Sequence, residues 1–337
     1  MTHAGFTEVT GWWFGPGEAA GLGTALCWVF TSYCFATAGR QLGAGTVNLI
    51  RSGLALPPLL LLAGLLTGSP WPQASSETIL WLALSGVVGL AIGDQFLFAA
   101  LVEIGPRLTV LLMTLAPVFA AILGLAMLGE VITPMGLVGM AITLTGIAWV
   151  VAERPTLRVP ADGAPSPHLR GVVFALLAAA SQGFGVVLAK QGMIGGAEEV
   201  APISAQVVRM LAGLLALLLA WSLFGPRRWM VGARRSGPLR LDRRGWTGML
   251  GGTLLGPVVG VWLSLISVRL LEAGVASTLM AMTPVLVLPF SRWIDRERIG
   301  LRAGLGAAIA VAGVAVLALS DSATAPEAAT TAVLETP

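Results

Sequence analysis

Three charged side chains stand inside long apolar stretches of this sequence. They are Arg51 in "NLIRSG", Asp94 in "AIGDQFLFAAL" and Arg209 in "QVVRML". If these stretches cross a bilayer, each charge costs at least ~2.5 kcal/mol on insertion scales, so such residues usually pair with another group, bind a ligand or carry protons. All three are therefore candidates for the functional chemistry of the chain.

Arg51 and Asp94 are predicted to lie at the same depth. Each stands seven residues from the same end of two consecutive apolar stretches, which is about 10 Å at 1.5 Å per helical residue. An ion pair between them would be structural if it only fixed helix packing. It would be functional if it formed a gate, or a proton-coupling site in which Asp94 changes protonation when the pair opens.

Arg209 has no acidic residue in its own stretch or in the next one. The position in the second half of the chain that corresponds to Asp94 is occupied by Val261. A buried guanidinium needs hydrogen-bond acceptors, and an anionic substrate is one source of them. The alternative is an arginine that bonds to backbone carbonyls or extends toward the membrane surface.

Neutral polar and aromatic side chains inside the stretches are weaker candidates for a substrate pathway. The polar ones are Asn48, Gln95, Ser181 and Gln182, and the aromatic ones are Trp28, Tyr33 and Trp262. The amides and the hydroxyl could bond a ligand or hold helices together. The aromatic rings could line a cavity or bind a cation, or simply pack.

The composition decides which elements must position these residues. Of 337 residues, 56% are hydrophobic and 11% are charged, with a mean hydropathy of +0.85, which is typical of a polytopic membrane protein. A span needs about 20 apolar residues, and continuous runs of that length favour helices over barrel strands. We predict an all-α integral membrane protein with ten transmembrane helices, at 19–38, 44–66, 78–101, 107–128, 132–152, 170–189, 201–224, 246–268, 274–294 and 300–320.

Several kinds of site find no support in the sequence. Cys27 and Cys34 lie seven residues apart within one span, or about 10.5 Å along a helix, which is too far for a disulfide. His3 and His168 fall in a tail and a loop, so no metal-ligand spacing exists. No glycine-rich motif opens a phosphate loop. We expect no cofactor, no metal, no nucleic-acid partner and no enzymatic activity.

The basic residues predict the orientation of the chain. With ten spans, one face carries only Lys190 and Arg269, whereas sixteen arginines fall in loops of the other face, seven of them within 227–244. The positive-inside rule places the arginine-rich loops in the cytosol and both termini outside. We expect a multi-pass protein of a bacterial cell (inner) membrane.

The sequence also contains an internal repeat. Pro117 and Glu130 recur as Pro284 and Glu297 at a constant separation of 167 residues, and four glycine pairs share it: Gly89 with Gly256, Gly93 with Gly260, Gly139 with Gly306, and Gly146 with Gly313. Arg40 corresponds to Lys190, and Arg51 corresponds to Arg209, at separations shorter than 167 residues. Five spans per repeat would invert the second copy, an architecture associated with alternating access around a central site.

The repeat defines the predicted domains and the role of the prolines. These domains are an N-terminal tail at 1–18, repeats at 19–152 and 170–320, a linker at 153–169 and a disordered tail at 321–337. Pro117 and Pro284 are expected to kink their helices near mid-membrane and face one another across a cavity. Glu130 and Glu297 are interpreted as boundary residues without substrate contact.

The chain contains the run "APVFAAILGLAMLGEVITPMGLVGMAITLTGIAWV", its repeat "TPVLVLPFSRWIDRERIGLRAGLGAAIAVAGVAVLAL" and an arginine in the second span of each half. In these features the chain resembles EamA-type transporters of the drug/metabolite transporter superfamily. The resemblance covers about 19–320 and implies a ten-helix carrier made of two inverted five-helix repeats. Such carriers often export metabolites, amino acids or drugs. Many members have cytosolic termini, whereas the charges here predict the reverse.

The leading hypothesis is a secondary active transporter that exports small organic solutes by alternating access. Its partners would be a small-molecule substrate, the lipid bilayer and protons as a candidate coupling ion, and it would act as a monomer or homodimer. One alternative is an integral-membrane enzyme for lipid-like substrates, although the acidic pairs at 198–199 and 295/297 have no histidine partner. Another is a membrane protein that transports nothing.

Overall fold

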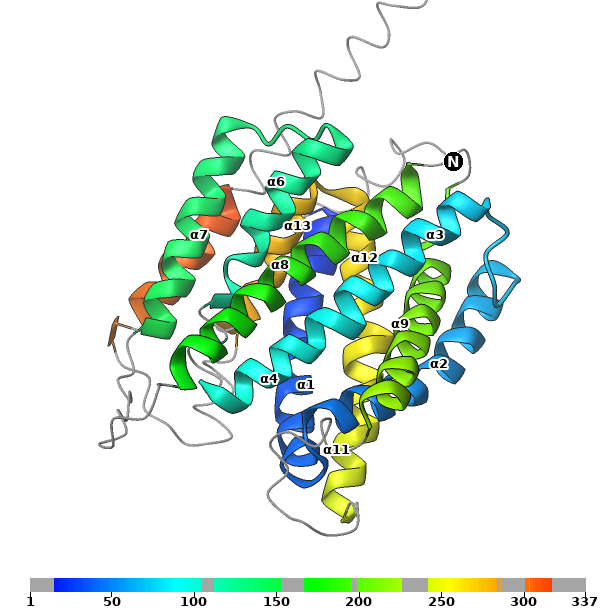
Figure 1. The fold of residues 1–337 in the computed structure, drawn as a ribbon. Coiled ribbons are helices and arrows are strands. Elements are labelled where there is room, and N and C mark those ends of the chain that lie inside the picture. Colours follow the sequence, from blue (N-terminus) through cyan, green and yellow to red (C-terminus); the bar gives the residue numbers. More distant parts are fainter. Residues whose placement is uncertain are drawn as a thin grey trace, which may run out of the picture.

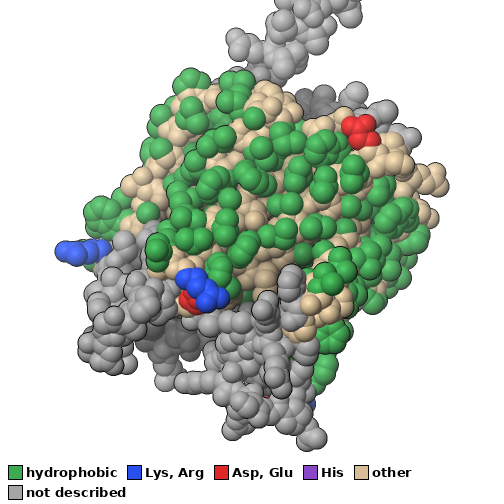
Figure 2. Space-filling model, viewed as in Figure 1, with side chains coloured by type: hydrophobic (Ala, Val, Ile, Leu, Met, Phe, Trp, Pro, Cys, Tyr) green, Lys and Arg blue, Asp and Glu red, His purple; other side chains and the backbone are tan. Residues whose placement is uncertain are grey.

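The structure is a computed structural model that describes residues 15–104, 109, 112–152, 167–195, 199–225, 242–283, 285–286, 301–302 and 304–316. Every regular element in these ranges is helical (Figure 1). Apolar side chains cover most of the face seen in Figure 2, and the few charged side chains lie near its margins. Such a surface suits a protein surrounded by lipid, and the predicted all-α class is confirmed for the described residues.

The first half of the chain begins with two long helices, α1 (Pro16–Leu42) and α2 (Ala44–Thr67). A continuous helix follows, made of α3 (Ser76–Ser85), the wider π-helical segment η2 (Gly86–Gly93) and α4 (Asp94–Glu103). Then come α6 (Ala116–Leu128) and α7 (Pro134–Ala152). Ser75 caps α3 by accepting a hydrogen bond from Thr78 N at 3.2 Å, and Gly129 ends α6 in the left-handed conformation with φ of 67°.

The second half has the same order of elements. It contains α8 (Pro167–Ile194) and α9 (Pro202–Phe224), then the continuous helix of α11 (Arg243–Thr253), η3 (Leu254–Gly260) and α12 (Val261–Leu270). The last described elements are α13 (Ala273–Met280) and a helix at Gly304–Val316. Asp242 caps α11 by accepting from Gly245 N at 2.6 Å.

Within the described ranges, five helices are long and apolar enough to cross a membrane: Gly45–Thr67, Ser76–Ala100, Leu169–Ile194, Pro202–Leu223 and Arg243–Leu270. Shorter apolar helices occupy Ala116–Leu128, Pro134–Trp149 and Gly304–Val316. The 27-residue α1 covers the first predicted span. Each of the five long helices lies at a predicted span, and the total of ten remains a prediction.

Helices of one half pack mainly against helices of the other half. Helix α8 runs alongside α3, η2 and α4, whereas α1 runs alongside α11, η3 and α12, and α2 packs against α9 (Figure 1). The fourth helix of the first half, α6, contacts α8, and α13 contacts α1 in the corresponding way. The two halves are therefore interlocked rather than placed side by side as separate bundles.

Glycines of the internal repeat form matching contacts between α7 and the helix at Gly304–Val316. A Cβ atom at Gly146 would lie 2.7 Å from Gly306 O, and one at Gly313 would lie 2.8 Å from Gly139 O. The two contacts are equivalent, because Gly313 is the repeat partner of Gly146 and Gly139 is the repeat partner of Gly306. The two helices thus form a self-complementary, small-residue interface.

The chain is also broken at the same place in both halves. Turns at 114–115 and 281–282 interrupt the helices three residues before the position of each repeated proline. The hydrogen bonds at these turns recur at the repeat separation, with Leu115 N to Leu112 O at 3.1 Å and Met282 N to Leu279 O at 3.1 Å. Pro117 occupies the first turn of α6, where a proline is tolerated because no N–H is needed. Pro284 lies outside the described residues.

Close packing between the halves gives a stability prediction. A Cβ atom at Gly86 in η2 would overlap the backbone carbonyl of Arg209, whereas a Cβ at Gly53 in α2 would meet nothing within 4 Å. We expect Gly86→Ala to destabilise the fold by about 1–3 kcal/mol, the usual cost of overpacking. Gly53→Ala should leave stability unchanged or raise it slightly. Thermal unfolding in detergent checks both, and equal midpoints for the two variants would contradict the interlocked packing.

Candidate functional site

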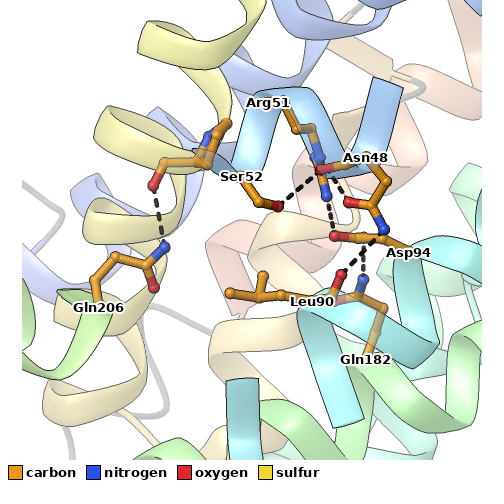
Figure 3. A network of polar contacts seen from close by, with 8 residues as sticks. Asn48, Arg51, Ser52, Leu90, Asp94, Gln182 and Gln206 are labelled. Atoms are coloured by element: carbon orange, nitrogen blue, oxygen red, sulfur yellow. Dashed lines mark hydrogen bonds and ion pairs between the residues drawn. The ribbon is translucent and has the colours of Figure 1, made fainter. Parts of the chain in front are cut away.

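The ion pair between Arg51 and Asp94 lies at the junction of α2, η2 and α4 (Figure 3). Arg51 Nη2 contacts Asp94 Oδ2, as expected from their predicted depth, and the two side chains are only 12% and 10% exposed. Asp94 is the first residue of α4, directly after the π-helical segment. π-Helical segments are rare and frequently mark functional sites.

Neutral side chains hold both members of the pair. Asn48 Oδ1 accepts from Arg51 Nε at 3.0 Å, and its amide donates to the carbonyl of Leu90 in η2 at 3.3 Å. Gln182 of α8 donates to Asp94 Oδ1 at 3.0 Å. Because Gln182 belongs to the second half of the chain, the carboxylate is held from both halves.

Two aromatic rings complete the surroundings of Arg51. Its guanidinium carbon lies 5.7 Å from the ring centre of Phe35 on α1 and 5.3 Å from that of Phe98 on α4. Such cation–π contacts favour the charged guanidinium and limit its movement. Arg51 is therefore held by an anion, an amide and two rings.

A second copy of this arrangement lies at α9 and η3. Gln206 precedes Arg209 by three residues, as Asn48 precedes Arg51, and donates to the carbonyl of Pro257 at 3.1 Å. Pro257 stands in η3 where Leu90 stands in η2, and this second amide–carbonyl bond is drawn in Figure 3. The repeat thus includes the amide, the arginine and the π-helical carbonyl.

The second copy differs from the first in its charge. Val261, the first residue of α12, takes the position that Asp94 takes in α4. Arg209 is 4% exposed, and its buried Nε has no hydrogen-bond partner among the described residues. Gln206 Oε1 is likewise buried without a partner there.

Asp94 is nevertheless close enough to Arg209 for their charges to attract. The guanidinium lies against η2, because a Cβ at Gly89 would be 3.4 Å from Arg209 Nη2. The two spans nearest Arg209 contain no acidic residue, as the sequence indicated, and Asp94 belongs to the other half of the chain, which sequence spacing does not predict. In the described part of the chain, the centre therefore holds two buried guanidinium groups and one carboxylate.

The remaining candidates are distributed around this centre. Gln95 follows Asp94, and its buried Oε1 has no partner in the described part of the chain. Trp262 follows Val261 and packs against the apolar cluster of α2 and α9 that includes Met210. Pro117 lies on α6, which packs against α8 and α13 rather than at the ion pair.

Another buried ion pair joins the halves at one end of the molecule. Lys190 of α8 contacts Glu130, at the end of α6, and the side chains are 8% and 12% exposed. Lys190 also donates to Leu271 O, and Glu130 Oε2 accepts from Ala273 N at 2.9 Å, which caps α13. Glu130 is a boundary residue, as predicted, but it acts between helices of different halves. Its repeat partner Glu297 lies outside the described residues.

The two ion pairs at this end give a matched prediction. Lys190→Met would leave Glu130 buried without a counter-ion, which typically costs about 3–5 kcal/mol. Arg269 pairs with Glu199, which is 72% exposed, so Arg269→Met should cost only about 0–1 kcal/mol. Unfolding in detergent measures the difference. Similar losses in both variants would show that the Lys190 pair contributes no more than a surface contact.

The described residues contain no group of three or more His, Cys, Asp or Glu side chains able to hold a metal ion. Among the acidic residues considered for an enzyme, Glu199 contacts Arg269, and the others lie outside the described ranges. The observed chemistry is that of buried charges at the contact between two related halves of a helical membrane protein.

Comparison with known proteins identifies these halves. The EamA-like transporter family matches residues 15–152 and 169–319, so the chain belongs to this family and contains two copies of its domain. Membership indicates a membrane transporter of the drug/metabolite transporter type. No curated protein matches the sequence. A solved structure titled "Crystal structure of protein" has the same fold, with a TM-score of 0.70 at 17% identity, over 90% of this chain and 96% of that one.

Proposed function

We propose that the protein is a secondary active transporter that exports small organic solutes by alternating access. The observation that carries the proposal is the repeated arrangement of amide, arginine and π-helical carbonyl, one copy in each half, at the contact between α2 and α9. Related halves that meet around buried charges are the usual construction of such carriers. Rocking of one half against the other would expose this centre first to one side of the membrane and then to the other.

The ion pair Arg51–Asp94 is the proposed coupling element. Asp94 is bonded to Arg51 of its own half and to Gln182 of the other half. Movement between the halves would break the bond to Gln182 and change the surroundings of the carboxylate, which alters its affinity for a proton. Proton binding to Asp94 would then be linked to the direction in which the centre faces.

Helix packing supports an inverted arrangement of the halves. In Figure 1, α1 and α8 begin at opposite ends of the molecule, although they are the first helices of the two halves. Arg170 and Arg243 stand at the start of α8 and α11, at the end where α4 and α9 finish, and Lys190 and Arg269 stand at the other end. The basic loops would place the first of these ends in the cytosol of a bacterial cell.

Counterflow in liposomes tests the proposed function. The purified protein is reconstituted with a mixture of unlabelled metabolites, amino acids and amphipathic drugs inside, and labelled members of the mixture are added outside, with and without a pH gradient. We expect saturable exchange of at least one solute and a response to the gradient. Absence of saturable exchange for every solute would refute the carrier, and gradient-independent exchange would refute proton coupling.

A further inference from the structure

Arg209 is a buried cation whose copy of the repeated arrangement lacks a carboxylate. In the first copy, Asp94 neutralises Arg51 from the first position after the π-helical segment. In the second copy that position is Val261, and Arg209 Nε has no hydrogen-bond partner among the described residues. A buried guanidinium that shares its only nearby carboxylate and leaves an N–H unbonded is unfavourable, so an anion that hydrogen-bonds to it would bind with a gain.

Asp94 forms no hydrogen bond with Arg209, because its oxygens bond to other side chains. One carboxylate oxygen of Asp94 contacts Arg51, and the other accepts from Gln182 at 3.0 Å. Arg209 therefore receives the attraction of a shared negative charge but no hydrogen bond from it. Among the described residues, the centre holds two guanidinium groups and one carboxylate, so one more anion would neutralise its excess positive charge.

Neighbouring groups indicate the shape of the missing ligand. Gln206 stands three residues before Arg209 on the same helix face, and its buried Oε1 has no partner in the described part of the chain. Residues three apart on a helix are neighbours, with about 5–6 Å between their Cβ atoms. A ligand bound to Arg209 could thus also offer a hydrogen-bond donor to Gln206.

We propose a subsite in which Arg209 binds the carboxylate of the transported solute beside Val261, where this carboxylate takes the place that Asp94 occupies in the other half, and in which Gln206 Oε1 accepts a hydrogen bond from a donor group of the same solute. This proposal rests on the transporter function and assigns its substrate class, a small organic carboxylate. Val261 is only partly buried, and the contact of α9 with η2 is formed between the halves. Movement of the halves would therefore open the path to Arg209.

Val261→Asp tests the subsite by supplying the missing carboxylate from the protein itself. The full chain is purified in detergent, and thermal unfolding is followed with a panel of small monocarboxylates, each matched by its neutral amide, at constant chloride concentration. For the native chain, we expect at least one carboxylate to raise the midpoint while its amide does not. In Val261→Asp, the midpoint without ligand should rise and the apparent carboxylate affinity should fall about ten- to a hundredfold, the range of a charged hydrogen bond.

Control variants keep the test decisive. Val261→Asn has the same shape without the charge and should keep the response to carboxylate, and Arg209→Gln should lose it while remaining folded. Inorganic phosphate or chloride shifting the midpoint as strongly as the carboxylate would overturn the assignment to organic carboxylates. Equal shifts by acid and amide, no shift with any carboxylate, or an undiminished response in Arg209→Gln would overturn the subsite. Saturable counterflow confined to neutral or cationic solutes would overturn this proposal and leave the transporter intact.

Discussion

Replacing Asp94 by Asn is expected to reduce gradient-driven transport at least about tenfold, because the amide cannot neutralise Arg51 or exchange a proton. It would also lower stability, since breaking a buried pair by removing one partner typically costs about 3–5 kcal/mol. Transport in liposomes and unfolding in detergent measure the two effects. The loss of activity alone does not separate a coupling role from a structural one.

The double variant Arg51→Gln/Asp94→Asn makes that separation. It removes both charges and leaves neutral groups able to bond to Asn48 and Gln182, so stability should recover in large part. If Asp94 couples transport to protons, the double variant folds but still shows no response to a pH gradient. Recovery of gradient-driven transport together with stability would mean that the pair only holds α2 against α4.

Arg209→Gln is expected to reduce transport, as Asp94→Asn does, but without a loss of stability. Removing a buried charge that has no hydrogen-bond partner at Nε among the described residues should leave the unfolding midpoint unchanged or raise it. Saturable flux should nevertheless fall at least about tenfold, because a charged hydrogen bond contributes roughly 1.5–3 kcal/mol. A gain in stability at the expense of activity is typical of binding sites.

Arg209→Lys provides the matched control for charge. It keeps the cation but loses the planar fork that binds a carboxylate through two hydrogen bonds, so we expect partial activity with a raised KM. Full activity in Arg209→Gln would show that the guanidinium does not contact the solute. Unfolding of Arg209→Gln at lower temperature than the native chain would assign Arg209 a structural role instead.

The internal repeat accounts for how much of the fold could be predicted from the sequence. Proline is rare enough for the match of Pro117 with Pro284 to be informative, and the broken helices appear at both places. The similar depth of Arg51 and Asp94 predicted their contact because they lie on consecutive helices. Both the broken helices and the Arg51–Asp94 contact follow from the spacing of residues along the chain and from the rise per residue of a helix.

Contacts between the halves could not be predicted in the same way. The attraction of Asp94 for Arg209 and the pairing of Lys190 with Glu130 join helices far apart in sequence, and hydrophobic periodicity does not say which helices meet. The rings of Phe35 and Phe98 make cation–π contacts with Arg51. The presence of a phenylalanine in the sequence does not predict such a contact. Gln206 is the residue that the sequence could have indicated, since it precedes Arg209 by three residues as Asn48 precedes Arg51.

Alternating access of the centre is the central claim, and the accessibility of position 261 tests it most directly. Val261→Cys is made in a Cys27→Ala/Cys34→Ala background and treated with a membrane-impermeant thiol reagent, in intact cells and in inside-out vesicles. We predict labelling from both sides, with the balance between them shifted by transported solute. Labelling from one side alone, whatever solute is present, would contradict alternating access at this centre.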